Sequence, residues 1–436
     1  VLSKFSNTQY LVINLLEAPI LAFILAFIVR YYNTDDQFNT GYVFSKNLNM
    51  PAYLFMSVIV ALFMGLTVSA EEIIRDRKIL KREKFLHLHR SSYLVSKISI
   101  LFAISAIQTL LFVLVGNFVL EIKGMLFIHW AILFTTSCFA NLLGLNISSA
   151  FNSAVTIYIL IPILLIPQLI LSGVVVKFDK LNPVIGNTAT VPAVGDLMAS
   201  RWAFEAAMVS QFKDNKFEQQ FYLYDKIMAE SDYKKIYYIP DLESRLNFVQ
   251  LNHKNSQPEI QKIVAKDLQV IQHEIQEELK LIGKDNFKYL SSLTSEKYDS
   301  MAYVETTTFF DALKKFYNNR YTKADHEKDR IVTRLTKNAE REKEFEKERN
   351  SYQNEAISVL VKNQEELNRI IEQNGNLIQK IYPIYKDPEP EHIVDFDAQF
   401  YMPAKHFLGY NIDTFYFNLG VIWSMTVVMI FTLYIE

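Results

Sequence analysis

Six apolar stretches, each long enough to cross a membrane as a helix, constrain this chain more than any other feature of its sequence. A hydrocarbon core about 30 Å thick requires about 20 apolar helical residues. Within lipid, a helix satisfies its own backbone hydrogen bonds. One such stretch could be a buried helix of a soluble domain, but six together predict a multi-pass membrane protein. The stretches are Leu11–Val29, Ala52–Ala70, Val95–Val115, Met125–Leu145, Val155–Val176 and Ile412–Ile435.

Charged side chains are concentrated in one long segment between the fifth and sixth stretches. Residues 213–405 hold 34 of the 47 acidic and 30 of the 45 basic side chains, so the rest of the chain is too apolar for water. We therefore predict five spans within 1–212, a water-exposed insert over 213–405 and the sixth span within 406–436. The expected fold class is an all-α membrane protein with six transmembrane helices and a large extracytoplasmic helical, coiled-coil insert.

Composition and motifs exclude several functions for these residues. A net charge of −2 argues against a nucleic-acid partner. Cys138 is the only cysteine, which excludes a disulfide framework and a cysteine-based metal site. The only Gly-Lys pair, Gly283-Lys284, lacks the preceding glycine and the following hydroxyl residue of a phosphate-binding loop. We expect no catalytic site, no metal and no cofactor in this chain.

The distribution of cations predicts the orientation in the membrane. Lysine and arginine accumulate in cytoplasmic loops, and the loop after the second stretch carries Arg75, Arg77, Lys78, Lys81, Arg82, Lys84 and Arg90, whereas its neighbours carry Lys46 and Lys123. Counting spans from this loop places the Lys177–Asn411 connection on the far side, periplasmic if the membrane is a bacterial inner membrane. Acidic residues precede the cations, which suits a helix over 71–90. Residues 71–90 form either a solvated loop that fixes the topology or an amphipathic helix that docks a cytoplasmic partner.

Two groups of motifs suggest a family. The first runs through Glu71–Arg77, Lys81–Lys84 and Ser92–Lys97, between the second and third spans. The second comprises Ser172-Gly173, Asn182-Pro183 and Ser200–Ala206, after the fifth span. In order and spacing they resemble the G-type ABC transporter permeases, which are the White-type and pleiotropic-drug-resistance exporters. The insert is far longer than the corresponding loop of the eukaryotic members, and the ATPase domain that precedes their first span is missing from this sequence.

The resemblance implies the permease half of an ATP-driven exporter that acts as a homodimer in contact with lipid. ATP and magnesium would bind a cassette domain located upstream of Val1 or on a separate subunit. The cytoplasmic helix 71–90 would couple to that domain through Glu72, Arg75, Arg77, Arg82 and Glu83. An external re-entrant segment over 190–210 would carry the family motif residues Arg201, Trp202, Phe204 and Glu205.

In the family, the second and fifth spans line the substrate path at the dimer interface. The corresponding residues here are Phe55, Met56, Val60, Phe63, Ile163, Pro167, Gln168 and Ser172. Pro162 and Pro167 would allow the fifth helix to bend, because proline removes a backbone donor. The path is mostly apolar and aromatic, which favours a hydrophobic or amphipathic substrate.

The insert has the pattern of long helices. Ser256–Glu259 fits a capping box, and apolar residues at spacings of three and four then continue from Val264 to Ile282, before Gly283. A second run extends from Asp325 to Ile381, with one heptad-like apolar seam from Ile331 onward. This run predicts an antiparallel coiled-coil hairpin or a single solvated helix, and we favour the hairpin.

Two alternatives to export remain open. A mechanical transducer would use ATP hydrolysis to move the insert against a periplasmic partner, with nothing crossing the spans. A membrane-anchored coiled-coil scaffold would need no ATPase, although six spans exceed what an anchor requires. The long insert favours the transducer, whereas the motifs after the fifth span favour transport. An ATPase cassette upstream of Val1 or in a neighbouring gene would exclude the scaffold.

The predicted topology can be tested by cysteine labelling. In intact spheroplasts, a membrane-impermeant maleimide should label a Ser300→Cys variant and should leave a Leu80→Cys variant unlabelled until the membrane is permeabilised. The opposite pattern would mean that a span has been miscounted.

Overall fold

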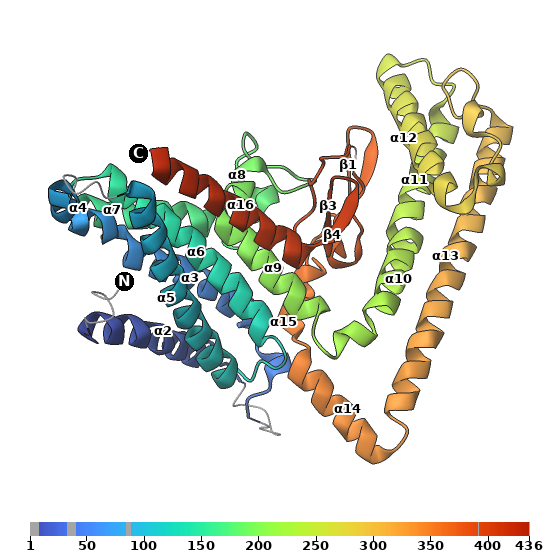
Figure 1. Ribbon diagram of the computed structural model, residues 1–436. Coiled ribbons are helices and arrows are strands. Elements are labelled where there is room, and N and C mark those ends of the chain that lie inside the picture. The colour runs from blue at the N-terminus through green and yellow to red at the C-terminus, as the bar shows by residue number, and fades with distance from the viewer. Residues whose placement is uncertain (1–7, 33–40, 84–88, 391, 436) are drawn as a thin grey trace. The chain divides into compact units, whose positions relative to one another are not determined.

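The computed structural model describes residues 8–32, 41–83, 89–390 and 392–435, and it is mostly helical (Figure 1). The chain forms two compact units, which we describe separately. Unit 1 comprises residues 1–219, 343–361 and 387–436, and unit 2 comprises residues 220–342 and 362–386.

Among the described residues of unit 1, five helices are long and apolar enough to cross a membrane. They are α2 (Thr8–Val29), α3 (Met50–Ala70), α5 (Arg90–Val119), α6 (Leu126–Ala150) and α16 (Thr414–Ile435). These five helices confirm five of the six predicted spans, at approximately the predicted positions. Helix α4 (Glu72–Glu83) follows α3, and residues 84–88 of the predicted 71–90 helix lie outside the described residues.

The fifth apolar stretch is shorter than predicted. It forms α7 (Ala154–Ile170), a helix of 17 residues that contains Pro162 and Pro167. The chain then turns at Gly173, where φ is +81°, a value that glycine adopts without strain. The expected Val155–Val176 helix therefore ends early, because the residues after Leu171 leave the helical conformation.

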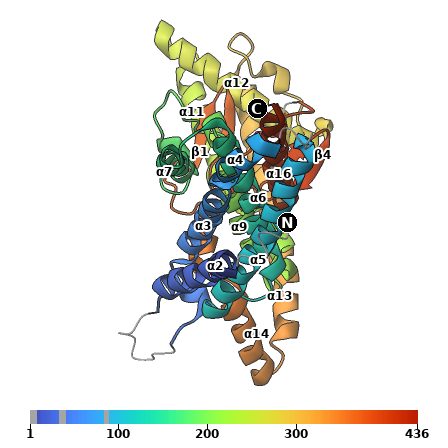
Figure 2. The same ribbon diagram turned by 60° about the vertical axis from the view of Figure 1, so that its left-hand side comes forward.

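The described spans pack through close backbone contacts. Helix α3 lies along α6, α2 along α5, and α16 along α6 (Figure 2). At Gly65 of α3, an added Cβ would lie 2.7 Å from both Ala140 Cβ and Ser137 O of α6. In lipid, such small residues allow two helices to approach and to gain van der Waals contact. Gly144 of α6 meets Ser69 of α3 in the same way.

The remainder of unit 1 consists of short elements that follow the spans. Helix α8 (Ala193–Asp196) leads into the buried helix α9 (Ala199–Lys213), which packs on α3, α6 and α16. After unit 2, residues 343–352 of α14 (Ala339–Tyr352) and helix α15 (Glu355–Val361) return to unit 1. Strands β3 (Ala404–Phe407) and β4 (Tyr410–Asp413) pair antiparallel, with Lys405 opposite Ile412, and lead into α16.

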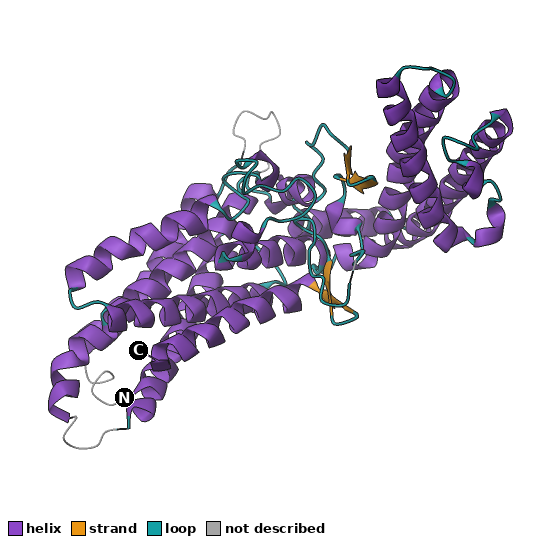
Figure 3. Ribbon diagram, turned by 90° about the horizontal axis from the view of Figure 1, so that it is seen from above, coloured by secondary structure: helices purple, strands orange, loops and turns teal. Residues whose placement is uncertain are grey.

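Unit 2 is a helical bundle with one small hairpin. Its helices are α10 (Tyr222–Tyr233), α11 (Ile239–Asn252), α12 (Pro258–Ile282) and α13 (Ser300–Leu335). A π-helical turn, Lys234–Tyr238, joins α10 to α11. Pro240 follows and lacks the N–H that would complete the regular pattern, which accounts for the wider turn. Strands β1 (Ile370–Gln373) and β2 (Asn376–Gln379) form the hairpin (Figure 3).

The helix predicted from the apolar spacing of Val264 to Ile282 is confirmed by α12, in which Val264, Leu268, Ile271 and Leu279 are all buried in the core of unit 2. The predicted capping box is wrong. The N-cap residue is Gln257, and its side chain makes no capping hydrogen bond. Pro258 at the first helical position, which has no N–H to satisfy, supplies the start of this helix instead.

For the run from Asp325 to Ile381 we favoured an antiparallel coiled-coil hairpin over a single solvated helix, and the structure forms neither over these residues. Helix α13 ends at Leu335, and Asn354 starts a new helix by accepting a hydrogen bond from the Ile357 N–H at 3.0 Å. Asn374 and Gly375 then form a hairpin turn, with φ of +55° and +84°. The seam from Ile331 to Ile381 is thus divided among several elements, and Leu367 is 89% exposed. With its two hairpins, the described chain is mostly helical rather than all-α.

We predict that Gly65→Val will destabilise the membrane domain, because the added methyl groups must displace the backbone of α6. Overpacking of this kind costs about 1–3 kcal/mol. The matched control is Gly420→Val in α16, where nothing lies within 4 Å of an added Cβ. Fluorescence-detected size-exclusion chromatography after heating should show earlier loss of the Gly65→Val peak. Equal loss of both variants would contradict the proposed close contact.

Candidate functional site

Helix α4 is held at its start by the end of α6. The Ser148 hydroxyl oxygen accepts hydrogen bonds from the backbone N–H groups of Ile73 at 3.0 Å and Ile74 at 3.1 Å. These N–H groups belong to the first turn of α4, which has no partners for them within the helix. Arg77 donates to the carbonyl oxygen of Ser149 at 2.8 Å, where the negative end of the α6 dipole favours a cation.

Ionic contacts join the same helix to α5. Glu72 is 2% exposed, and its carboxylate receives hydrogen bonds from Lys97 of α5 at 3.0 Å and from Arg75 at 3.1 Å. Lys97 Nζ also lies 2.5 Å from Asp76 Oδ2, and the Tyr93 hydroxyl donates to the same oxygen at 3.2 Å. We call this arrangement the α4 junction; its members are Glu72, Arg75, Asp76, Arg77, Tyr93, Lys97 and Ser148.

The structure therefore brings three of the five predicted coupling residues, Glu72, Arg75 and Arg77, into one junction. Arg82 and Glu83 belong to the last turn of α4, but their side chains lie outside the described residues. Sequence reasoning missed Lys97 and Ser148 as members of this junction. Lys97 ends the first motif group, and a lysine close to the start of an apolar span needs an anionic partner there.

The predicted path residues fall into two groups. Met56, Phe63 and Ile163 are 39%, 40% and 55% exposed, and Val60 lies between the first two on the same face of α3. Pro167 is half-buried. By contrast, Phe55 is buried, with its ring centroid 5.5 Å from that of Phe204.

Gln168 and Ser172 are also buried and have contacts within unit 1. The Gln168 side-chain oxygen accepts from the Ser200 N–H at 3.0 Å, and the Ser200 hydroxyl donates to the Gln168 carbonyl at 2.6 Å. Gln168 thus joins α7 to the first turn of α9. The Ser172 hydroxyl donates to the Leu169 carbonyl at 2.8 Å and stabilises the turn after α7.

A buried ionic cluster surrounds α9. Glu205 and Lys405 are both fully buried, and their Oε1 and Nζ atoms are 2.8 Å apart. Asn418 of α16 donates to the second Glu205 oxygen at 2.9 Å. Arg201 lies 3.4 Å from the same oxygen and 3.5 Å from Asp196. We call these five residues the α9 cluster.

Two carboxylates and two cations balance the charge of the α9 cluster. Burial alone would raise the pKa of Glu205, but Lys405 and Arg201 attract its anion and hold this pKa below the ordinary value. Burial raises the pKa of Asp196 against the opposing attraction of Arg201. The Arg201 guanidinium also stacks on the Trp202 ring, 3.6 Å from its centroid.

The predicted motif residues Arg201, Trp202, Phe204 and Glu205 thus lie together on α9, all of them buried. Their partners Lys405 and Asn418 were missed, since Lys405 was assigned to the water-exposed insert. The signal that could have identified Asn418 is its polar side chain within an apolar span.

A third contact region involves residues 343–361, which we call the docking segment. Asn354 donates to the carbonyls of Phe44 at 2.7 Å and Asn47 at 2.9 Å, in the loop between α2 and α3. Lys123, between α5 and α6, donates to Ser351 at 3.1 Å. Beyond α9, Glu218 accepts from Gln353 at 2.7 Å. The docking segment therefore contacts three connections at the end of the spans opposite α4.

These helices, junctions and connections define a multi-pass helical membrane domain. Within the described ranges, no group of three or more histidine, cysteine, aspartate or glutamate side chains is placed to hold a metal.

A protein-family model described as ABC-2 type transporter matches residues 1–212, so this part of the chain is an ABC-2 type transporter permease domain. Membrane domains of this type generally pair with ATPase subunits. A comparison with curated proteins found no match.

We predict that Glu205→Leu will strongly destabilise unit 1, because Lys405 and Arg201 would remain buried without their shared anion. Removing one partner of a buried pair costs about 3–5 kcal/mol. The double variant Glu205→Leu/Lys405→Leu should recover part of this loss. Thermal unfolding of the purified chain in detergent, followed by tryptophan fluorescence, measures both.

The matched control is Glu121→Leu, which breaks the exposed ion pair with Arg30. Exposed pairs contribute at most about 1 kcal/mol. Equal loss of stability in Glu205→Leu and Glu121→Leu would show that the α9 cluster is not a buried ionic unit.

Proposed function

We propose that this chain is the permease half of a G-type ABC exporter that acts as a homodimer in a bacterial inner membrane. ATP and magnesium bind the partner cassette domain, and α4 receives the movement of that domain on the cytoplasmic side. Residues of unit 2 then belong to the periplasmic side. The observation that carries the proposal is the α4 junction, which fastens a charged helix to two spans.

The α4 junction is suited to transmit force. Because Ser148 and Arg77 hold α4 to α6, and Glu72 holds it to Lys97 of α5, α4 cannot shift without moving both spans. Helix α6 is packed closely against α3 at Gly65 and Gly144. A push on α4 therefore reaches α3, and with it the exposed face that carries Met56 and Phe63.

The exposed faces of α3 and α7 support a dimeric transport path. On α7, Tyr158, Ile163 and Ile166 are each at least 50% exposed. Apolar faces within a membrane are covered by lipid or by another protein surface. We assign the face of α3 to a second copy of the chain, with a hydrophobic or amphipathic substrate moving between the two copies. Pro162 and Pro167 provide α7 with a place to bend.

Coupling can be tested by charge reversal at the end of α4. In proteoliposomes that contain the chain with its ATPase, Arg82→Glu/Glu83→Arg should retain basal ATP hydrolysis but lose most ATP-dependent transport of an amphipathic fluorescent dye. The reason is that interface charges orient the two partners. The matched control is Arg341→Glu/Glu342→Arg, which reverses an adjacent, exposed pair on α14. Unchanged dye transport and dye-stimulated hydrolysis in the α4 variant would contradict the assignment.

A mechanical transducer is the second candidate, and the docking segment favours it. This segment contacts three connections of the membrane domain, and it is continuous in sequence with unit 2 at both of its ends. Movement of the spans would thus be passed along the chain to unit 2. An ATP-dependent change in spin-label distances within unit 2, without dye transport, would favour this function over export.

A further inference from the structure

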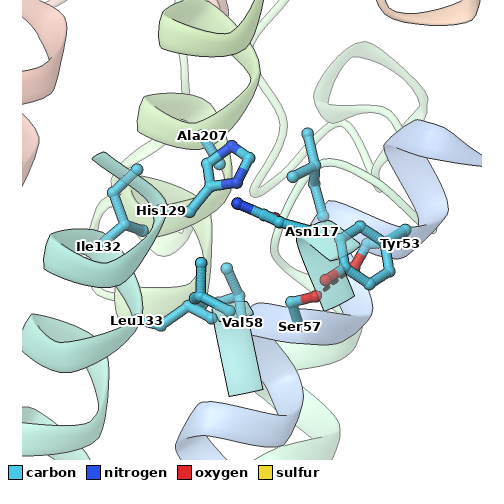
Figure 4. A pocket seen from close by; sticks show the side chains of 10 residues that line it. Tyr53, Ser57, Val58, Asn117, His129, Ile132, Leu133 and Ala207 are labelled. Carbon is cyan, nitrogen blue, oxygen red and sulfur yellow. Dashed lines mark hydrogen bonds between the residues drawn. The ribbon is translucent and has the colours of Figure 1, made fainter. Parts of the chain in front are cut away.

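A small space lies among α3, α5, α6 and α9, apart from both ionic groups. Its volume is about 10 Å³. Apolar side chains such as Val58 of α3, Ile132 and Leu133 of α6, and Ala207 of α9 form much of its wall (Figure 4). An apolar wall alone would make this an ordinary packing defect, which stays dry.

Two polar side chains change that expectation. Asn117 of α5 and His129 of α6 line the same space, and they are 8% and 5% exposed. Neither the oxygen nor the nitrogen of the Asn117 amide has a hydrogen-bond partner among the described residues. His129 Nε2 has none of good geometry either, although the Gln211 side chain of α9 lies beside the His129 side chain. Figure 4 shows the Asn117 amide directed toward the His129 ring across the space.

Unpaired polar atoms are unusual in a protein interior. Most buried polar groups have a partner in the protein or an ordered water molecule, and those without one lose their hydration with no compensation. Here three such atoms belong to two side chains, from two helices, that line one cavity. Ser57, which also lines it, uses its hydroxyl to donate to the Tyr53 carbonyl at 2.7 Å and does not pair with either side chain.

The size of the space decides which ligand it can accept. A buried water molecule requires roughly 10–15 Å³ and two to four polar partners. The cavity between Asn117 and His129 offers about that volume and three unpaired polar atoms. A molecule larger than water does not fit. Water can donate and accept, so it suits the Asn117 amide together with either neutral tautomer of His129.

We propose that one ordered water molecule occupies this cavity and bridges Asn117 of α5 to His129 of α6. The bridge links two spans whose ends toward α4 are both held by the α4 junction. Unlike a direct side-chain contact, a bridging water keeps its hydrogen bonds when the helices shift by a fraction of an ångström, because the molecule can move between its partners.

The direct test is a high-resolution cryo-electron microscopy map of the full chain in nanodiscs. The expected result is density for one water molecule within hydrogen-bond distance of the Asn117 amide and His129 Nε2. A dry cavity, or a direct hydrogen bond between the two side chains, would overturn the proposal.

A second measurement uses water-edited solid-state NMR on chain carrying ¹⁵N-labelled histidine. A transfer signal from water to the His129 ring should be present in the natural sequence and lost in Asn117→Leu. The matched variant Ser57→Ala alters the cavity wall without removing a proposed water partner and should keep the signal. An absent signal in the natural sequence, or one that persists in Asn117→Leu, refutes the bridge.

Discussion

The fully buried ion pair between Glu205 and Lys405 joins the two sides of the long excursion that interrupts the membrane domain. The two residues are 200 positions apart in sequence. Their contact places the hairpin that precedes α16 against α9, and Asn418 of α16 completes the arrangement. Because the cost of closing a loop rises by only about 0.6 kcal/mol for each doubling of its length, a very long insert is compatible with this closure. The ion pair makes the closure specific, since neither charge is stable in the interior alone.

A buried carboxylate with cationic partners is also found at the other end of the spans. Glu72 is buried as deeply as Arg201, and its carboxylate is stabilised by Lys97 of the neighbouring helix α5 and by Arg75 of its own helix. The two groups differ in what they connect. The α9 cluster joins segments that are remote in sequence, whereas the α4 junction joins consecutive helices. The first therefore determines which elements belong to the membrane domain, and the second determines how a displacement of α4 would spread through it.

The parts of this fold that could be predicted from sequence are those encoded by local patterns. Five spans follow from uninterrupted apolar residues, and helix α12 follows from apolar spacing. The hairpin at Asn374-Gly375 also had a local signal, but the apolar residues around it fit a heptad and were assigned to a helix. Lys405 could not be placed, since its burial depends on a partner 200 residues away. Glu72, Arg75 and Arg77 were singled out from the order of the motifs in the chain, whereas Ser148 becomes a cap only once α4 and α6 are packed together.

Because of the β3–β4 hairpin, a change of length has different consequences in different segments of this chain. Side chains alternate between the two faces of a strand, so a shift of one residue would turn Lys405 away from Glu205 and put an uncharged neighbour or His406 in its place. The turn at Leu408 and Gly409 fixes the register, with both residues at positive φ. During evolution, unit 2 could gain or lose whole helices while the ten residues from Ala404 to Asp413 kept an invariant length. A family of related chains would then share this hairpin as its most constant spacing, next to its most variable region.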